Sequence, residues 1–109
     1  MYTKYQKTST RSFTNKLDPL HIKQEISPLD FYTHELPDAV LIKDNWNDGG
    51  LCPFHNDGKP GSFYVNLETG TYNCFSCGAK GGDVIAFTMA IYELSFFEAL
   101  VKLSEEWGV

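Results

Sequence analysis

All three cysteines of this 109-residue chain lie in two short motifs, together with one of its three histidines. The first motif is Cys52-Pro53-Phe54-His55, and the second is Cys74-Phe75-Ser76-Cys77, followed by Gly78. Two residues between ligands allow a tight turn to direct both side chains at one metal ion. Three thiolates and one imidazole select tetrahedral zinc over calcium or magnesium. The spacing therefore predicts one zinc ion bound by Cys52, His55, Cys74 and Cys77.

The predicted zinc is structural rather than catalytic. Four protein ligands complete its coordination shell, whereas a catalytic zinc normally keeps one position for water. Zinc deaminases combine His-x-Glu with Pro-Cys-x-x-Cys, but this chain has no His-x-Glu, and Asn73 precedes Cys74. We therefore expect no catalytic activity from this chain alone. His21 and His34 lie outside both motifs and are expected to be ordinary helix or surface residues.

Composition and charge limit the partners of the chain. With 42% hydrophobic and 21% charged residues, we expect one small folded domain. The longest apolar stretch, Val84–Ile91, is far shorter than the ~20 residues that a membrane span needs, and no signal-peptide pattern opens the chain. We expect a cytoplasmic protein without a membrane partner. Residues 1–23 carry a net charge of +4 and residues 24–109 a net charge of -9, so any DNA contact must be local.

The segments around the motifs predict mixed helix and strand. Residues 1–19 are polar and basic, and we expect a flexible tail followed by a domain over residues 20–109. The expected helices cover residues 20–36, interrupted at Ser27-Pro28, then residues 84–92 after Asp83, and a last helix from the capping box Ser95–Glu98 to Trp107. The expected strands cover residues 40–42, 62–67 and 71–75, with turns at 44–50 and 68–70.

The apolar positions of these elements predict a core rich in phenylalanine. The residues expected there are Leu29, Phe31, Tyr32, Leu36, Phe54, Phe63, Phe75, Phe87, Phe96, Ala99, Leu100 and Leu103.

Together the motifs resemble the N-terminal zinc-binding domain of bacterial and phage DNA primases of the DnaG type. The family pattern is Cys-Pro-Phe-His, Pro-Ser-Phe-x-Val, Cys-Phe-x-Cys-Gly, and Gly-Asp followed by an apolar run. The matching stretches are residues 52–55, 60–65, 74–78 and 81–87, and the resemblance covers about residues 20–107. Gly61 interrupts Pro60 and Ser62, which lengthens the loop near Lys59 and is not expected to move the ligands.

The resemblance implies an α+β zinc ribbon, a small antiparallel sheet that carries two metal-binding turns and is flanked by helices. In the family, this domain recognises the single-stranded template where a primer begins, while a separate domain polymerises RNA. The implied partners are single-stranded DNA and a primase catalytic domain or replicative helicase, on the same chain or another. The alternative is a protein-interaction module that docks on a primase or helicase and regulates it, which the acidic body also suits.

Single strands are held by aromatic side chains that stack on bases and by a few cations on phosphates. Tyr64 and Tyr72 are expected to share one sheet face and to contact DNA together with Lys80. Lys43, Lys59 and Trp46 are expected at the margin of that surface. The alternative is that Tyr64, Tyr72 and Trp46 are packing residues of the domain itself.

Overall fold

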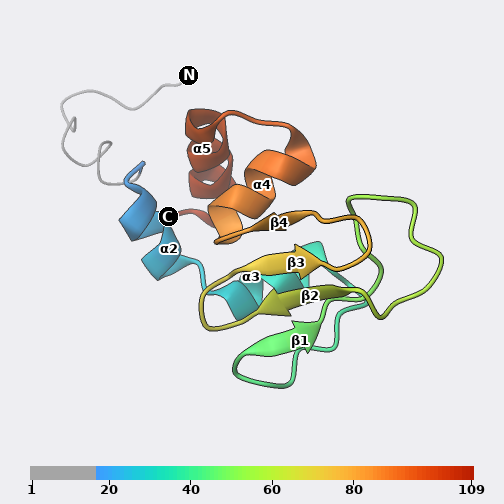
Figure 1. The fold of residues 1–109 in the computed structure, drawn as a ribbon. Helices are drawn as coiled ribbons and strands as arrows, with labels where there is room; N and C mark the ends of the chain where they lie inside the picture. The colour runs from blue at the N-terminus through green and yellow to red at the C-terminus, as the bar shows by residue number, and fades with distance from the viewer. Residues whose placement is uncertain (1–16) are drawn as a thin grey trace, which may run out of the picture.

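The fold is described from a computed structural model, in which residues 17–109 are described (Figure 1). The expected tail therefore lies almost entirely outside the described residues. Of its last positions, Leu17 packs against the core, Asp18 caps helix α2, and Pro19 is the first residue of that helix.

Two short helices open the described part, α2 (Pro19–Glu25) and α3 (Pro28–Glu35). The Asp18 side chain accepts from the backbone N–H of Leu20, and the Ser27 side chain accepts from that of Asp30. A proline occupies the first turn of each helix, where its missing N–H costs nothing. The predicted interruption at Ser27-Pro28 is therefore confirmed.

A four-stranded antiparallel sheet follows, with the strands in chain order. The strands are β1 (Trp46–Asp48), β2 (Phe63–Asn66), β3 (Tyr72–Cys74) and β4 (Lys80–Gly81). Helices α4 (Val84–Tyr92) and α5 (Phe96–Trp107) complete the chain, and both begin at the predicted caps, Asp83 and Ser95. In Figure 1 helix α3 lies behind the sheet, whereas α4 and α5 lie beyond its β4 edge. The α+β zinc-ribbon architecture is confirmed.

The first strand differs from expectation. Residues 40–42 do not form a strand, because Val40 makes only an isolated bridge to Asp48 and Ile42 is 79% exposed. The strand lies within the expected turn instead. The buried Asn47 side chain explains this: its Oδ1 accepts from the N–H groups of Ile42 and Lys43, and its Nδ2 donates to the carbonyls of Lys43 and Asn45. One amide closes the turn and leaves β1 free to pair with β2.

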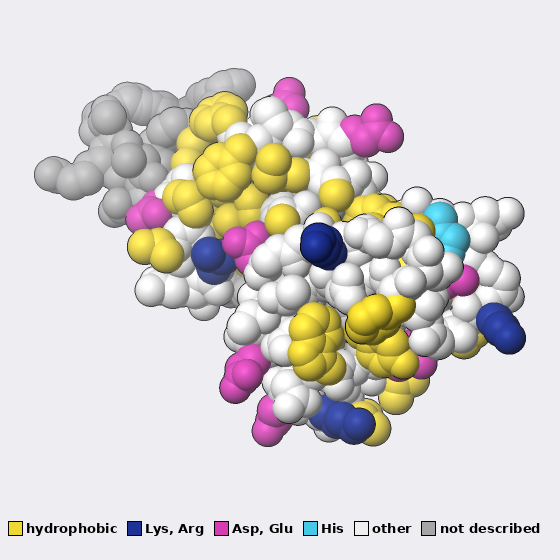
Figure 2. Space-filling view, viewed as in Figure 1, with side chains coloured by type: hydrophobic (Ala, Val, Ile, Leu, Met, Phe, Trp, Pro, Cys, Tyr) yellow, Lys and Arg dark blue, Asp and Glu magenta, His cyan; other side chains and the backbone are white. Residues whose placement is uncertain are grey.

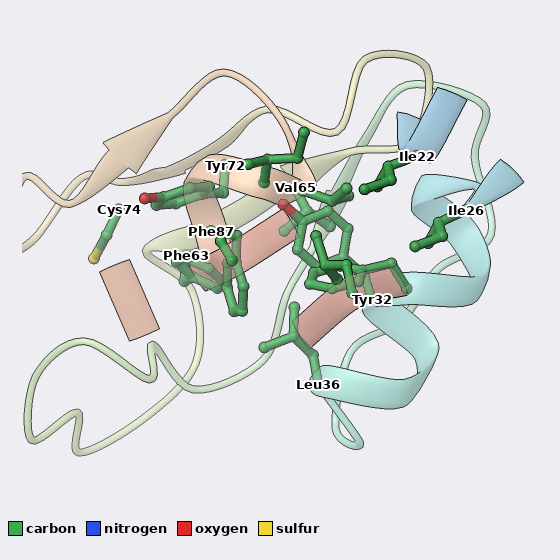
Figure 3. Packing of buried hydrophobic residues seen from close by; sticks show 14 of the residues in the cluster. Ile22, Ile26, Tyr32, Leu36, Phe63, Val65, Tyr72, Cys74 and Phe87 are labelled. Carbon is green, nitrogen blue, oxygen red and sulfur yellow. The ribbon is translucent and has the colours of Figure 1, made fainter. Parts of the chain in front are cut away.

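The core lies between the sheet and the helices (Figure 3). Phe87 of α4 is at its centre, with edge-on contacts to Phe31, Tyr32, Phe54 and Tyr72 at ring-centroid distances of 5.3–5.6 Å. Such aromatic pairs add stability beyond the area that they bury.

Three residues expected in the core are exposed instead. Leu29 and Phe96 lie in the first turns of their helices and are 46% and 48% exposed, while Phe75 is 75% exposed. The other expected core residues are buried or partly buried against the core.

No single helix within residues 17–109 has both the length and the apolar character to cross a membrane. Helices α4 and α5 would pass this test only as a pair, and they are bent by 105° at their junction.

Candidate metal centre and sheet surface

The β2–β3 hairpin brings the two cysteine motifs together. Cys74 ends β3 and lies opposite Phe63 of β2. The backbone N–H of Gly78 donates to the Cys74 carbonyl at 2.9 Å, which closes a tight turn around Ser76. Gly78 has a φ of 83°, a conformation that favours glycine and that its place after the motif predicts. The turn therefore holds Cys74 and Cys77 on the same side.

The four candidate ligands converge at one end of the sheet. The ligand atoms of Cys52, His55, Cys74 and Cys77 all lie within 4.8 Å of one another, and the Sγ atoms of Cys52 and Cys77 are 3.9 Å apart. Zn–S bonds of about 2.3 Å in a tetrahedron place two sulfurs about 3.8 Å apart. His55 Nδ1 is buried without a hydrogen-bond partner among the described residues, as expected of a ligand atom. The donor set and its spacing fit a zinc ion.

The environments of the buried thiols differ. Burial alone would raise the pKa of Cys74, but the backbone N–H groups of Cys77 and Ser76 outweigh it and lower this pKa to about 7. Burial raises the pKa of Cys52 to about 12. Because metals bind the thiolate, zinc binding at this site would release the thiol protons of its cysteines.

The face of the sheet that points away from the core is exposed and carries aromatic side chains. Cross-strand pairs place Tyr64 opposite Asn73 and Asn73 opposite Lys80, so these three share one face. Trp46 lies on the same face opposite Asn66 and is 43% exposed. Figure 2 shows apolar side chains gathered over this part of the molecule. A shallow groove runs along the face between Trp46, Asn73 and Lys80.

Tyr72 does not share this face. It lies opposite Val65, is 3% exposed and stacks on Phe54 with ring centroids 5.3 Å apart. The expectation that Tyr64 and Tyr72 form one platform is therefore wrong. Side chains alternate along a strand, and Tyr72 is one residue away from Asn73 and so points to the core.

Phe75 belongs to the exposed face and was missed. It follows β3 two residues after Asn73, and its ring lies edge-on to Tyr64 at 6.0 Å. Side chains alternate between the two faces along Thr71–Phe75. Assigning Tyr72 to the core therefore predicts that Phe75 lies on the exposed face.

The three lysines expected on or beside the DNA-binding surface are exposed to solvent. Lys43 precedes β1, Lys59 lies in the loop before β2, and Lys80 is in β4. Within residues 17–109 none of these three forms an ion pair, whereas Lys23 pairs with Asp83 and Lys102 with Glu106.

A small antiparallel sheet with a Cys-His-Cys-Cys group at one end defines a zinc finger of the ribbon class. The profile of the CHC2 zinc finger family, described for DnaG primases, matches residues 36–109. The chain therefore belongs to the CHC2 zinc finger family, and zinc is its cofactor.

Relatives and a solved structure agree with this assignment. The chain is 49% identical to the DNA primase of Mycobacterium bovis over 59 residues, which are 54% of the chain and 9% of the relative. It is 46% identical to the DNA primase of Helicobacter pylori strain J99 over 69 residues, 63% of the chain and 12% of the relative. The crystal structure of the zinc-binding and RNA polymerase domains of Aquifex aeolicus primase matches with a TM-score of 0.67 and 31% identity. That match covers 85% of this chain and 21% of the Aquifex chain. This chain thus spans about a tenth of the length of these curated relatives and corresponds to the zinc-binding domain of a DnaG-type primase.

Proposed function

We propose that this domain binds single-stranded template DNA across the exposed face of its sheet, as the recognition module of a DNA primase. The observation that carries the proposal is the grouping of Trp46, Tyr64 and Phe75 on one exposed face beside Lys80. A folded domain normally buries such rings, and exposed aromatic rings with nearby cations suit unpaired bases and phosphates.

The same proposal assigns Cys52, His55, Cys74 and Cys77 as the zinc ligands. The zinc has a structural role, because four protein ligands leave no position for water. The zinc affects the DNA-binding surface through the Cys74–Cys77 turn, because Phe75 lies in this turn. Loss of the metal would free this turn and with it one ring of the platform.

The strength of binding follows from the small number of contacts. Stacking contributes roughly 1–3 kcal/mol per base, while the described domain is acidic and offers only a few unpaired lysines. We expect dissociation constants on the order of 10⁻⁴–10⁻⁶ M, with a strong dependence on salt.

Primer synthesis requires a partner in this proposal. The Aquifex primase carries an RNA polymerase domain beside its zinc-binding domain. We assign catalysis to such a domain, on the same chain or another, and a replicative helicase is the alternative partner. This domain itself supplies template recognition and no catalytic group.

The test is an NMR titration of the zinc-loaded chain with short single-stranded oligonucleotides. We expect shifts at β1–β4 and in the Cys74–Cys77 turn, and weaker binding by Phe75→Ala. The matched control is Phe97→Ala, since Phe97 is a comparably exposed phenylalanine, 60% against 75%, in α5 rather than on the sheet. Equal loss in both variants, or no shifts at millimolar DNA, would overturn the proposal.

The second candidate is a module that docks on a primase or helicase. It is favoured by the exposed apolar side chains on the helices, Leu20, Phe96 and Phe97. Shifts confined to α5 when a primase catalytic domain or a helicase is added, without any response to DNA, would support this candidate instead.

A further inference from the structure

We propose that Asp57 is a positioning residue of the metal centre, which orients His55 so that Nδ1 binds the zinc. The inference rests on the proposed ligand set. Asp57 follows His55 by two residues, and its side chain is only 10% exposed. Its Oδ2 accepts from the backbone N–H of Cys52 at 2.8 Å, and its Oδ1 lies 3.5 Å from Nε2 of His55. One carboxylate therefore contacts both candidate ligands of the first motif.

These contacts distinguish the two nitrogens of the His55 ring. A neutral imidazole carries one N–H and one lone pair, and a metal takes the nitrogen with the lone pair. Nε2 faces a carboxylate, which accepts but cannot donate, so the proton is held on Nε2. Nδ1 is buried, has no hydrogen-bond partner among the described residues and is left for the metal.

The carboxylate has no other evident role in the described structure. Within residues 17–109, no lysine or arginine lies within ion-pair distance of Asp57, and the ring of His55 is the one basic group beside its carboxylate. Removing a carboxylate from water without compensation is costly. The Cys52 N–H and the His55 ring supply the compensation, and both belong to the Cys-x2-His turn.

The arrangement has two consequences for metal binding. The bond to Cys52 fixes the backbone of the first ligand, and the contact with Nε2 fixes the plane of the imidazole ring. Removing a carboxylate partner of a metal-bound histidine typically lowers metal affinity by about 10–100-fold.

The experiment measures zinc affinity by chelator competition on the full chain. Asp57→Asn keeps the size of the side chain and one oxygen acceptor but loses the charge, and we expect it to bind zinc about 10-fold more weakly. Asp57→Ala loses both contacts, and we expect a loss approaching about 100-fold. The matched control is Asp48→Asn, since Asp48 accepts a local backbone N–H from Gly50 at 2.8 Å but contacts neither motif.

Nitrogen-15 NMR of the imidazole rings supplies a readout that a merely structural role would not move. In the zinc-loaded wild type, we expect His55 to show a metal-bound Nδ1 and a slowly exchanging proton on Nε2. Asp57→Asn should retain Nδ1 ligation, with faster exchange of that proton. Metal on Nε2, or zinc affinities for both Asp57 variants equal to that of Asp48→Asn, would overturn the inference while leaving the ligand set intact. No response of either ring nitrogen to zinc would overturn the ligand set itself and the inference with it.

Discussion

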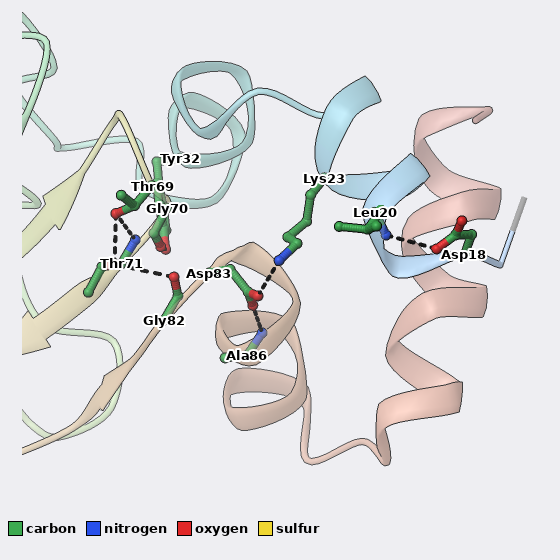
Figure 4. Close-up of polar contacts among 10 residues, drawn as sticks. All are labelled: Asp18, Leu20, Lys23, Tyr32, Thr69, Gly70, Thr71, Gly82, Asp83 and Ala86. Carbon is green, nitrogen blue, oxygen red and sulfur yellow. Dashed lines mark hydrogen bonds and ion pairs between the residues drawn. The ribbon is translucent and has the colours of Figure 1, made fainter.

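The buried hydroxyl of Tyr32 in helix α3 donates a 2.6 Å hydrogen bond to the carbonyl oxygen of Gly70, which ends the β2–β3 turn (Figure 4). Gly70 has a φ of 85°, and a Cβ added there would lie 3.2 Å from the backbone nitrogen of Val84. Asp83, which caps α4, also pairs with Lys23 of α2 at 3.3 Å. The turn of the hairpin that carries Cys74 therefore contacts α3 and the start of α4, and the cap of α4 is in turn paired with α2.

Replacing Tyr32 by Phe should destabilise the domain without removing its metal. The substitution leaves the buried Gly70 carbonyl without its donor, which costs about 1–3 kcal/mol. Urea unfolding of the zinc-loaded protein measures this change. The control is Tyr64→Phe, whose hydroxyl makes only an exposed 3.4 Å contact with the Gly61 carbonyl and should have little effect. Equal destabilisation by the two substitutions would contradict the role given to the Tyr32 hydrogen bond.

Stability should fall above about pH 10. Burial raises the pKa of Tyr32 well above its usual range, and burial together with Asp83 raises that of Tyr72. The folded state keeps these phenols protonated, whereas the unfolded chain ionises them near about pH 10. Their contribution is therefore intact below the unfolded-state pKa and decreases as the pH rises toward the folded-state values, by about 1.4 kcal/mol per pH unit for each tyrosine.

Urea unfolding from mildly to strongly alkaline pH, combined with tyrosine absorbance, checks this dependence. Tyr32→Phe should reduce the slope of unfolding free energy against pH by the contribution of one tyrosine. Ionisation of every tyrosine at the ordinary phenol pKa with the fold intact would contradict the assignment of Tyr32 and Tyr72 to the core.

The local features of this fold could be predicted from the sequence, because their causes are local. The caps at Ser27, Asp83 and Ser95 depend on residues within one helical turn, and each helix begins where its cap predicts. The metal motifs are equally local, since a Cys-x2-Cys turn and a following glycine specify their own geometry.

The predictions from sequence were wrong where the structure depends on a contact between distant segments, or on which face of the sheet a side chain takes. The sequence around Asn47 is typical of a turn, and only pairing with β2 makes it a strand. Tyr64 and Tyr72 lie on different strands, and which face each takes depends on the register of the hairpin. That register pairs Tyr64 with Asn73 and sends Tyr72 into the core. Asp57 was missed because its partners are defined only when the first metal motif has folded.

Tyr72 and Trp46 should separate stability from DNA binding. Tyr72→Ala removes a ring packed between Phe54 and Phe87 and should cost about 3–5 kcal/mol of unfolding free energy. Trp46→Ala removes a half-exposed ring from the sheet surface, so it should change stability little and weaken binding to single-stranded DNA. Urea unfolding and fluorescence anisotropy with a labelled oligonucleotide measure the two effects. Weak DNA binding by a stable Tyr72→Ala protein would restore Tyr72 to the binding surface.

Removal of zinc should unfold the domain. Metal binding in structural zinc sites is coupled to folding and contributes on the order of 10 kcal/mol, more than a small domain can replace. Cys74→Ser should therefore give a zinc-free and largely unfolded chain by elemental analysis and circular dichroism. The control is Ser76→Ala, in the same turn but not a candidate ligand. Full zinc content and wild-type melting in Cys74→Ser would exclude Cys74 as a ligand.

The basic N-terminal segment should contribute to the salt dependence of DNA binding. Residues 1–16 hold Lys4, Lys7, Arg11 and Lys16 and no acidic residue, whereas residues 24–109 have a net charge of -9. If these four cations bind phosphates, they release counterions, and the slope of log affinity against log salt becomes shallower by roughly 0.7 for each phosphate of a single strand that is no longer neutralised. Deleting residues 1–16 should therefore weaken binding and flatten the slope. The deletion retains Leu17, which packs against the core, so we expect the fold to be unchanged.

Changing the four cations to glutamine in the full chain separates the effect of charge from that of chain length and should reproduce the effect of the deletion. Anisotropy titrations from about 50 to about 200 mM salt measure both slopes, and slopes equal to that of the wild type would leave DNA binding to the sheet surface alone.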